Sequence, residues 1–274
     1  MLSGTAAFTY SYGPLSLGIQ KSAVSYGNFG SAKATGVSWA KNTTIGAAFA
    51  VNDNLSVSYQ ETESLRKSIL FFKQSLESIK VLDLTHMLAG PYTTMILADL
   101  GAEVVKIEQP KTGDITRNLL KDDPKYSLDG IGAYHLTLGR NKKSVELDLK
   151  SEEGLKLFKE LAEVADVVVD NFSQGVTKRL GIDHQSLKEV NPKIITCSIS
   201  GFGDTEVNRP AYDNLIQGYA GAMSITGTDR ENPVKSGIPI ADLGAGLYAV
   251  IGILSAIQSR EKNDTGEHVD ISML

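Results

Sequence analysis

The chain has 274 residues, 42% of them hydrophobic and 22% charged, which is typical of a globular protein with a sizeable core. Its formal net charge of −5 at pH 7 provides no excess of basic residues, so we expect no nucleic-acid partner. The single cysteine, Cys197, excludes an internal disulfide, and with no signal-peptide pattern at the N-terminus this favours a cytoplasmic location.

Residues 1–72 differ in composition from the rest of the chain. They are rich in Ser, Gly, Ala, Thr and Tyr, and short segments alternate small or polar residues with apolar ones, which is the period of a β-strand. The alternating segments are 6–12, 15–21, 36–40, 45–51 and 55–60. Segment 51–59 (VNDNLSVSY) resembles a turn and strand of bacterial porins. These residues therefore predict either an outer-membrane β-barrel fragment or a loosely folded β-rich extension.

The charge balance also changes along the chain. Residues 1–78 carry six Lys or Arg and four Asp or Glu, whereas residues 79–274 carry 21 and 28. We therefore expect three parts: a β-rich, porin-like extension over 1–72, a linker over 73–78 and a second domain over 79–274.

From residue 79 the sequence alternates between predicted strands and helices. Strands are expected at 80–84, 103–108, 143–149, 166–169, 194–199 and 268–271. Helices are expected at 89–100, 151–164, 175–180, 184–190, 211–223 and 242–260, with a further short helix near Tyr134 in the polar loop 110–140. Repeated strand–helix units joined by right-handed crossovers predict an α/β fold with a doubly wound parallel sheet of Rossmann-like type.

Several kinds of chemistry are made unlikely by motifs that the sequence lacks. Strand 80–84 is not followed by a G-x-G-x-x-G, and there is no P-loop, no G-x-S-x-G and no metal-spaced set of His and Cys. Doubly wound sheets bind ligands at the carboxyl ends of their strands. Polar or aromatic side chains follow three of the predicted strands there: His86; Asn171 and Phe172, with Arg179 soon after; and Asp213. Each also has a purely structural explanation, as a cap, a turn residue or a solvated charge.

Asp242 opens the most apolar stretch of the chain, with glycines at 237, 244 and 246 around it. The run 243–259 is at the short limit of a membrane span and contains three glycines, so we expect a buried core helix and no membrane contact for 79–274. Asp242 itself has two interpretations. Aspartate is a good helix N-cap, and a carboxylate there is also able to act as a nucleophile that the helix N-terminus keeps ionised.

A series of short motifs occurs in order from about residue 79 to the end: VLDLTH (81–86), AGP (89–91), LGAEVVKIE (100–108), GD (113–114), RNKKS (140–144), DNF (170–172), LG (180–181), NP (191–192), GFG (201–203), PAYD (210–213), Asp242 and TGEHVD (265–270). With this series the chain resembles the class III CoA-transferases, the CaiB/BaiF or formyl-CoA transferase-like family.

The resemblance implies an enzyme that moves coenzyme A from an acyl-CoA thioester to a carboxylic acid, with no permanently bound cofactor and no metal. The family's catalytic aspartate forms a mixed anhydride and then an aspartyl-CoA thioester, and it aligns with Asp242. The resemblance places coenzyme A contacts at His86, Ala89, Asn171, Phe172 and Arg179, and residues near the reaction centre at Asp213 and Tyr212.

Three departures limit what the resemblance implies. Leu88 stands where some members have a glutamine, so the donor and acceptor acids are not implied. Racemases of the same superfamily have a histidine where Tyr212 stands; this favours transfer and leaves an acyl-CoA racemase or isomerase as the alternative. Family members form interlocked homodimers through a second half that is missing from this sequence. We therefore expect no such dimer and a fragment or fused reading frame, which leaves two alternatives open: an active CoA-transferase and an inactive piece of one.

Overall fold

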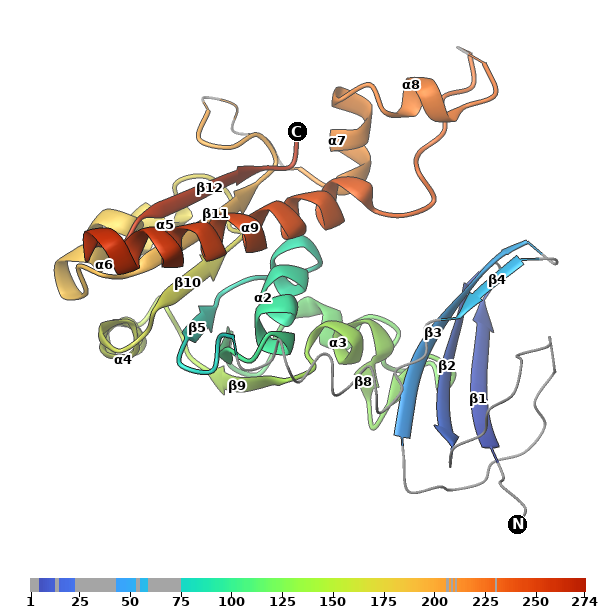
Figure 1. The fold of residues 1–274 in the computed structure, drawn as a ribbon, viewed down its shortest axis with the longest axis horizontal. Coiled ribbons are helices and arrows are strands. Elements are labelled where there is room, and N and C mark those ends of the chain that lie inside the picture. Colours follow the sequence, from blue (N-terminus) through green and yellow to red (C-terminus); the bar gives the residue numbers. More distant parts are fainter. Residues whose placement is uncertain are drawn as a thin grey trace. The chain divides into compact units, whose positions relative to one another are not determined.

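The computed structural model describes strands within residues 5–12, 15–22, 43–52 and 55–58, and residues 75–274 apart from 206, 208, 210 and 230 (Figure 1). The chain divides into two compact units, Met1–Phe71 and Phe72–Leu274.

The described part of the first unit is an antiparallel sheet with the strand order β1-β2-β3-β4. Its strands are β1 (Thr5–Tyr12), β2 (Leu15–Ser22), β3 (Thr43–Asn52) and β4 (Leu55–Ser58). Four of the five predicted strand segments correspond to these strands, as expected from their period of two. The fifth segment, 36–40, lies outside the described residues.

The second unit is built on a six-stranded parallel sheet with the order β12-β11-β10-β5-β6-β9. Its strands are β5 (Lys80–Asp83), β6 (Glu103–Glu108), β9 (Lys142–Glu146), β10 (Val167–Asp170), β11 (Ile195–Ser200) and β12 (His268–Ser272). The first strand of this sheet along the chain is β5. Strands β6 and β9 are added on one side of it, and β10, β11 and β12 are then added in turn on the other side. The predicted α/β fold with a doubly wound sheet is confirmed, and the direction of winding reverses between β5 and β10.

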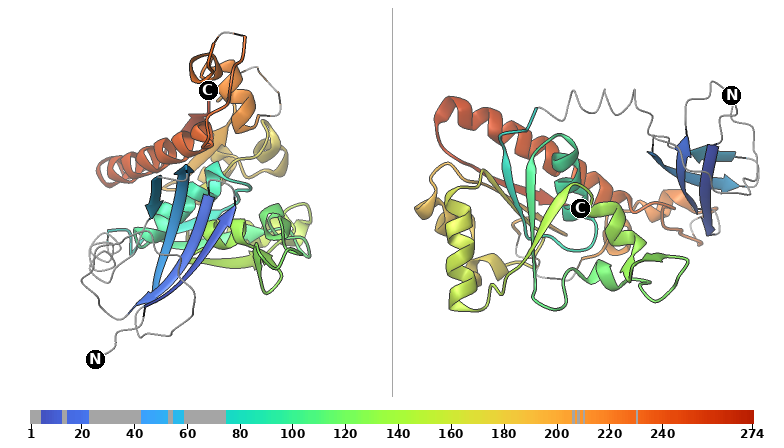
Figure 2. Two further views of the ribbon diagram at one scale, coloured as in Figure 1. Left: turned by 90° about the vertical axis from the view of Figure 1, so that its right-hand side faces the viewer. Right: turned by 90° about the horizontal axis from the view of Figure 1, so that it is seen from below.

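Helices cover both faces of this sheet, as Figure 2 shows. On one face α2 (Ala89–Asp99) and α9 (Ile240–Asn263) pack in a core with the sheet, and on the other α4 (Glu152–Glu163) and α6 (His184–Val190) do. Strand β10 is buried along its whole length because helices pack against it on both faces of the sheet. Ser151 precedes α4 and caps it by accepting a hydrogen bond from the Gly154 N–H, a role that serine often has at this position.

Helix α9 is the longest of the described helices. It is the one helix among the described residues that has the length and hydropathy to cross a membrane. One stripe, which includes Ala245, Ala249 and Ile253, is buried against the sheet and α2. The opposite stripe, with Leu247, Tyr248 and Ile251, is exposed. The prediction of a buried core helix therefore holds for one face only.

Some boundaries differ from the predicted ones for local reasons. The helix expected at 211–223 is two helices, α7 (Asp213–Tyr219) and α8 (Met223–Thr226), because Gly221 between them has a φ of +76°. The loop 110–140 contains η1 (Ile115–Asn118), the hairpin β7 (Ser127–Leu128) and β8 (Ile131–Gly132), and α3 (Ala133–Leu138). Helix α5 is Val176–Leu180. Leu76, within the segment 73–78, is buried in the core of the second unit.

Candidate active site

Two loops that lie far apart in the sequence meet at the point where the sheet reverses its winding. The backbone N–H of His86 donates to Asn171 Oδ1 at 2.8 Å, and Asn171 Nδ2 donates back to the His86 carbonyl at 2.7 Å. The Phe172 ring lies beside the His86 imidazole, with 5.8 Å between ring centroids. Three of the predicted ligand contacts thus form one cluster at the carboxyl ends of β5 and β10, where such sheets bind ligands.

The loop that carries His86 is tightly constrained. The next residue, Met87, has a φ of +66°, which is uncommon outside glycine, and a Cβ on Gly90 would lie 2.4 Å from the Thr85 side chain. Burial lowers the pKa of His86, although the charge of Asp114 opposes it. The imidazole is therefore neutral at pH 7 and offers one donor and one acceptor to a ligand.

Asp242 is the third residue of α9 and does not cap it. The helix begins at Ile240 after Pro239, which occupies the N-cap position and has no side-chain oxygen to offer. The amides of Ala241 and Asp242 donate instead to Asp213 Oδ1, at 2.8 and 3.4 Å. The interpretation of Asp242 as an N-cap is therefore wrong, because a carboxylate from α7 performs that role.

Burial and the neighbouring charge of Asp213 raise the pKa of Asp242 to about 6, and the backbone N–H of Ala89 acts in the opposite direction. We expected the helix N-terminus to keep Asp242 ionised, which by itself would lower its pKa. The direction of the shift is the reverse, because desolvation and a like charge outweigh the amides of one helix turn. A pKa of about 6 still leaves the carboxylate ionised at pH 7, and it makes this carboxylate more basic than an exposed one.

Asp213 belongs to a buried network that orients the start of α9. Its Oδ2 accepts a hydrogen bond from Gln217 Nε2 at 2.6 Å, and Gln217 Oε1 accepts one from the Ser236 N–H at 2.7 Å. The structure therefore brings Asp213 and Asp242 together at the start of α9. Tyr212, one residue earlier, is 63% exposed and contributes its backbone carbonyl to the first turn of α7.

Ala89 is the first residue of α2, and its N–H faces the Asp242 carboxylate because α2 and α9 cross closely. Thr93 Oγ1 lies 2.9 Å from the Ala89 carbonyl and 3.2 Å from the Gly246 carbonyl. A Cβ on Gly246 would lie 2.8 Å from the Tyr92 ring and 3.0 Å from the Ala89 carbonyl. Only glycine at position 246 allows this approach without displacing α2.

We expect Gly246→Ala to push α2 away from α9 and to lower the free energy of unfolding by about 1–3 kcal/mol, the usual cost of overpacking. Gly244→Ala is the matched control, because open space surrounds that position on the same helix and alanine favours helix by about 1 kcal/mol. Urea denaturation measures both. Equal stability of the two variants would contradict the close crossing at Gly246.

Tyr134 is a site residue that the sequence analysis missed. It lies on α3 and is 38% exposed, and partial burial together with the charges of Asp242 and Asp114 raises its pKa to about 12. The phenol therefore stays protonated at pH 7, and the charge of Asp242 acts on it. The expected short helix near Tyr134 was the only local signal, and nothing in the sequence relates it to a carboxylate 108 positions later.

Arg179 is less closely connected to the cluster. It is exposed on α5, and its guanidinium lies over Gly175, in the turn that follows Phe172. No carboxylate in the described part of the chain pairs with it, so its charge is available to an anionic ligand.

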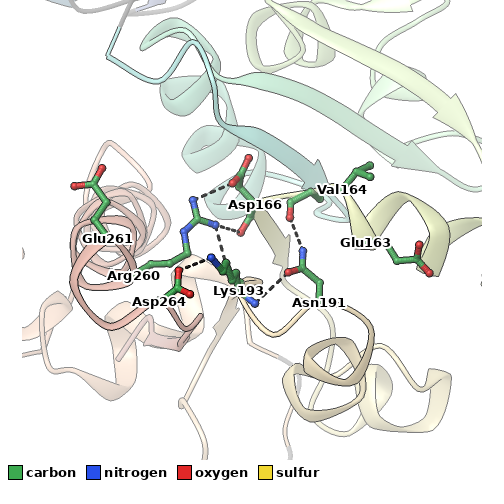
Figure 3. Close-up of a pocket in the computed structure, with 9 residues that line it drawn as sticks. Glu163, Val164, Asp166, Asn191, Lys193, Arg260, Glu261 and Asp264 are labelled. Atoms are coloured by element: carbon green, nitrogen blue, oxygen red, sulfur yellow. Dashed lines mark hydrogen bonds and ion pairs between the residues drawn. The ribbon is translucent and has the colours of Figure 1, made fainter.

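A cavity of about 400 Å³ lies at the opposite, amino-terminal end of the strands (Figure 3). Its cations are already paired: Arg260 contacts Asp166 at 2.9 Å and the Lys193 carbonyl at 3.2 Å, and Lys193 pairs with Asp264. These contacts tie the last turns of α9 to the starts of β10 and β11. The ion pairs that line this cavity therefore hold the fold together, and the cavity is separate from the cluster around Asp242.

The family model of CoA-transferase family III matches residues 76–274. Succinate–glutarate CoA-transferase of Agrobacterium fabrum is 40% identical over 209 residues, covering 74% of this chain and 52% of that protein. Formyl-CoA:oxalate CoA-transferase of Streptomyces avermitilis is 42% identical over 201 residues, covering 73% and 48%. A CaiB/BaiF family protein from Brucella suis superposes with a TM-score of 0.67 at 40% identity, covering 72% and 52%. The chain spans about half the length of the curated relatives it matches.

Proposed function

Because the chain belongs to CoA-transferase family III, we propose that it transfers coenzyme A from an acyl-CoA thioester to a carboxylic acid, with Asp242 as the nucleophile. The observation that carries this proposal is the setting of Asp242. Asp213 caps α9 in its place, so the Asp242 carboxylate is not used as a cap; it is partly buried, and its pKa is raised to about 6.

The chemistry proceeds through two covalent states of the aspartate. An Asp242 oxygen attacks the thioester carbonyl carbon, the carbon–sulfur bond breaks, and a mixed anhydride and the CoA thiolate result. The thiolate then attacks the Asp242 side-chain carbonyl, which releases the first carboxylic acid and leaves an aspartyl-CoA thioester. The acceptor carboxylate reverses these two steps. Each step exchanges one acyl bond for another and needs no redox partner.

The groups around Asp242 support this sequence. The Ala89 N–H acts on the Asp242 carboxylate, and the charge of Asp242 acts on the protonated Tyr134 phenol, so we assign both as donors for the oxygen that gains charge in each tetrahedral state. We assign the aromatic and amide cluster of His86, Asn171 and Phe172 to coenzyme A, and Arg179 to one of its phosphates. A cytoplasmic location stays a prediction.

The test is to trap the intermediate. The full chain is incubated with succinyl-CoA, a probe suggested by the succinate–glutarate relative, and then with hydroxylamine, which converts an anhydride or thioester of aspartate into a hydroxamate. Peptide mass spectrometry should find the hydroxamate on Asp242. The exposed Asp264 serves as an internal control. A hydroxamate on another carboxylate, or none, would refute the nucleophile.

The rate of adduct formation should depend on pH through Asp242. Only the ionised carboxylate attacks, and its pKa is raised to about 6, so the rate should increase as pH rises and level off above this midpoint. Single-turnover rates between pH 5 and 8 measure it. A flat profile across this range would show that the reacting group titrates elsewhere.

A further inference from the structure

A buried pair of opposite charges lies behind α2, on the side away from α9. Lys142 Nζ lies 3.0 Å from Asp83 Oδ2, and both side chains are almost completely buried. Burial alone would raise the pKa of Asp83, but Lys142 and Lys106 hold it well below its usual range. Burial lowers the pKa of Lys142, and the charge of Asp83 opposes this effect, so each member of the pair favours the ionised form of the other. The proposed chemistry does not use this pair.

All the hydrogen bonds of the Lys142 ammonium group go to residues of α2 and β5. Besides Asp83 it donates to the Pro91 carbonyl at 2.9 Å and to Thr94 Oγ1 at 2.7 Å, so its three N–H groups have three acceptors. Thr94 Oγ1 in turn donates to Asp83 Oδ2 at 2.7 Å. Two successive turns at the start of α2 are thus attached to the end of β5 and to β9 through one ammonium group.

The same ion pair also holds the loop before α2. Asp83 Oδ1 accepts hydrogen bonds from the backbone N–H and the hydroxyl of Thr85, the residue before His86. The fold of this loop therefore depends on a carboxylate that Lys142 keeps ionised.

From the first turn of α2 the connection continues to Asp242. Pro91 is two residues from Ala89, whose N–H faces the Asp242 carboxylate, and Thr93 joins α2 to the Gly246 carbonyl of α9. Lys142 on one side and α9 on the other thus determine together where the Ala89 N–H lies. Two apolar side chains in place of Asp83 and Lys142 would fill the same space at similar stability. They would make no hydrogen bonds to α2, and so they would not fix its orientation or its position along the helix axis.

We propose that Lys142 is a positioning residue for Asp242: through its bonds to Pro91 and Thr94 it holds the first turn of α2 so that the Ala89 N–H meets the Asp242 carboxylate. This inference rests on the proposed function for its catalytic consequence, but not for its geometry.

The test compares variants in the full chain. Lys142→Met alone leaves the buried Asp83 charge without its partner and risks unfolding, so the main variant is Asp83→Asn/Lys142→Met, which removes both charges together. Thr94→Val, which removes one acceptor and keeps the ion pair, is the milder variant. Lys143→Met is the matched control, because this neighbouring lysine is exposed and pairs with Glu103. Circular dichroism checks that each variant is folded.

The readout is the titration of Asp242, followed by ¹³C NMR of its side-chain carbonyl and identified by the signal lost in Asp242→Asn. The charge of Asp213 acts on Asp242, and Asp242 acts on Tyr134, and both residues are unchanged in all variants. Removing the Asp83–Lys142 pair, whose charges cancel, changes the electrostatic field at Asp242 only slightly. In the double variant the pKa of Asp242 should rise, because the Ala89 N–H no longer favours the ionised form, and Thr94→Val should shift it less. Lys143→Met should leave it unchanged.

The second readout is adduct formation with succinyl-CoA. It should fall about 10- to 100-fold in the double variant, the usual cost of a small misplacement at a reacting centre. A folded double variant in which Asp242 titrates as before would overturn the inference. If even the unchanged protein forms no adduct, the proposed function fails, and the titration still decides whether Lys142 positions Asp242.

Discussion

Replacing Asp242 with asparagine should lower the rate of coenzyme A exchange about 10⁴-fold, which corresponds to about 5 kcal/mol in the barrier. Asparagine has nearly the same shape but is neutral, and its amide neither attacks a thioester nor forms the anhydride. The measurement is exchange of labelled coenzyme A into succinyl-CoA, together with the hydroxamate assay. Exchange that survives the substitution would mean that another group is the nucleophile.

The same variant should keep its fold, which separates a chemical from a structural effect. The pKa of Asp242 is raised in the folded protein from an ordinary value of 3.8 to about 6. Its contribution to stability is therefore present below pH 3.8 and is lost as pH rises through 6. At pH 7 the charge is unfavourable in the fold, and Asp242→Asn should melt at the same temperature as the unchanged protein or a higher one. A lower melting temperature would contradict this sign.

Replacing Lys106 with methionine should lower the free energy of unfolding by about 3–5 kcal/mol, the usual cost of leaving a buried charge without its partner. Lys106 Nζ contacts Asp114 Oδ2 at 2.9 Å and the Thr85 carbonyl at 2.7 Å, and both charged side chains are buried. Urea denaturation monitored by circular dichroism measures the loss. A loss under 1 kcal/mol would show that water reaches Asp114 in the variant.

The double variant Lys106→Met/Asp114→Asn should recover much of this loss, because neither charge remains. It should also change the response to acid. Burial alone would raise the pKa of Asp114, but Lys106 and the Thr116 N–H lower it. The stability that this carboxylate provides is present above its unfolded pKa and is lost as pH falls through its folded pKa. Acid unfolding should therefore depend less steeply on pH in the double variant.

Much of the second unit could be predicted from short-range sequence patterns. The strands at 80–84, 103–108 and 194–199 are found with shifts of one residue at most, because apolar runs bounded by glycine or polar residues are local signals. The ordered motifs identified the family over 79–274, and the family model matches 76–274. Asp242 was singled out because a lone charge stood among glycines and apolar residues.

What these patterns could not predict depends on groups that are distant in the chain. His86 and Asn171 exchange hydrogen bonds across 85 positions, and Asp213 caps a helix 28 positions later. Tyr134 lies near Asp242 only because α3 and α9 belong to the same folded unit. The start of α9 was misplaced for the same reason, since its cap comes from α7.

The sequence by itself therefore determined the alternation of strands and helices, the family, and Asp242 as the candidate residue. It could do so because periodicity and motif spacing are properties of short stretches of sequence. The tertiary structure decided what that aspartate is: a carboxylate with a raised pKa instead of a cap. Desolvation and the field of Asp213 depend on which surfaces pack together, and no short stretch of sequence carries that information.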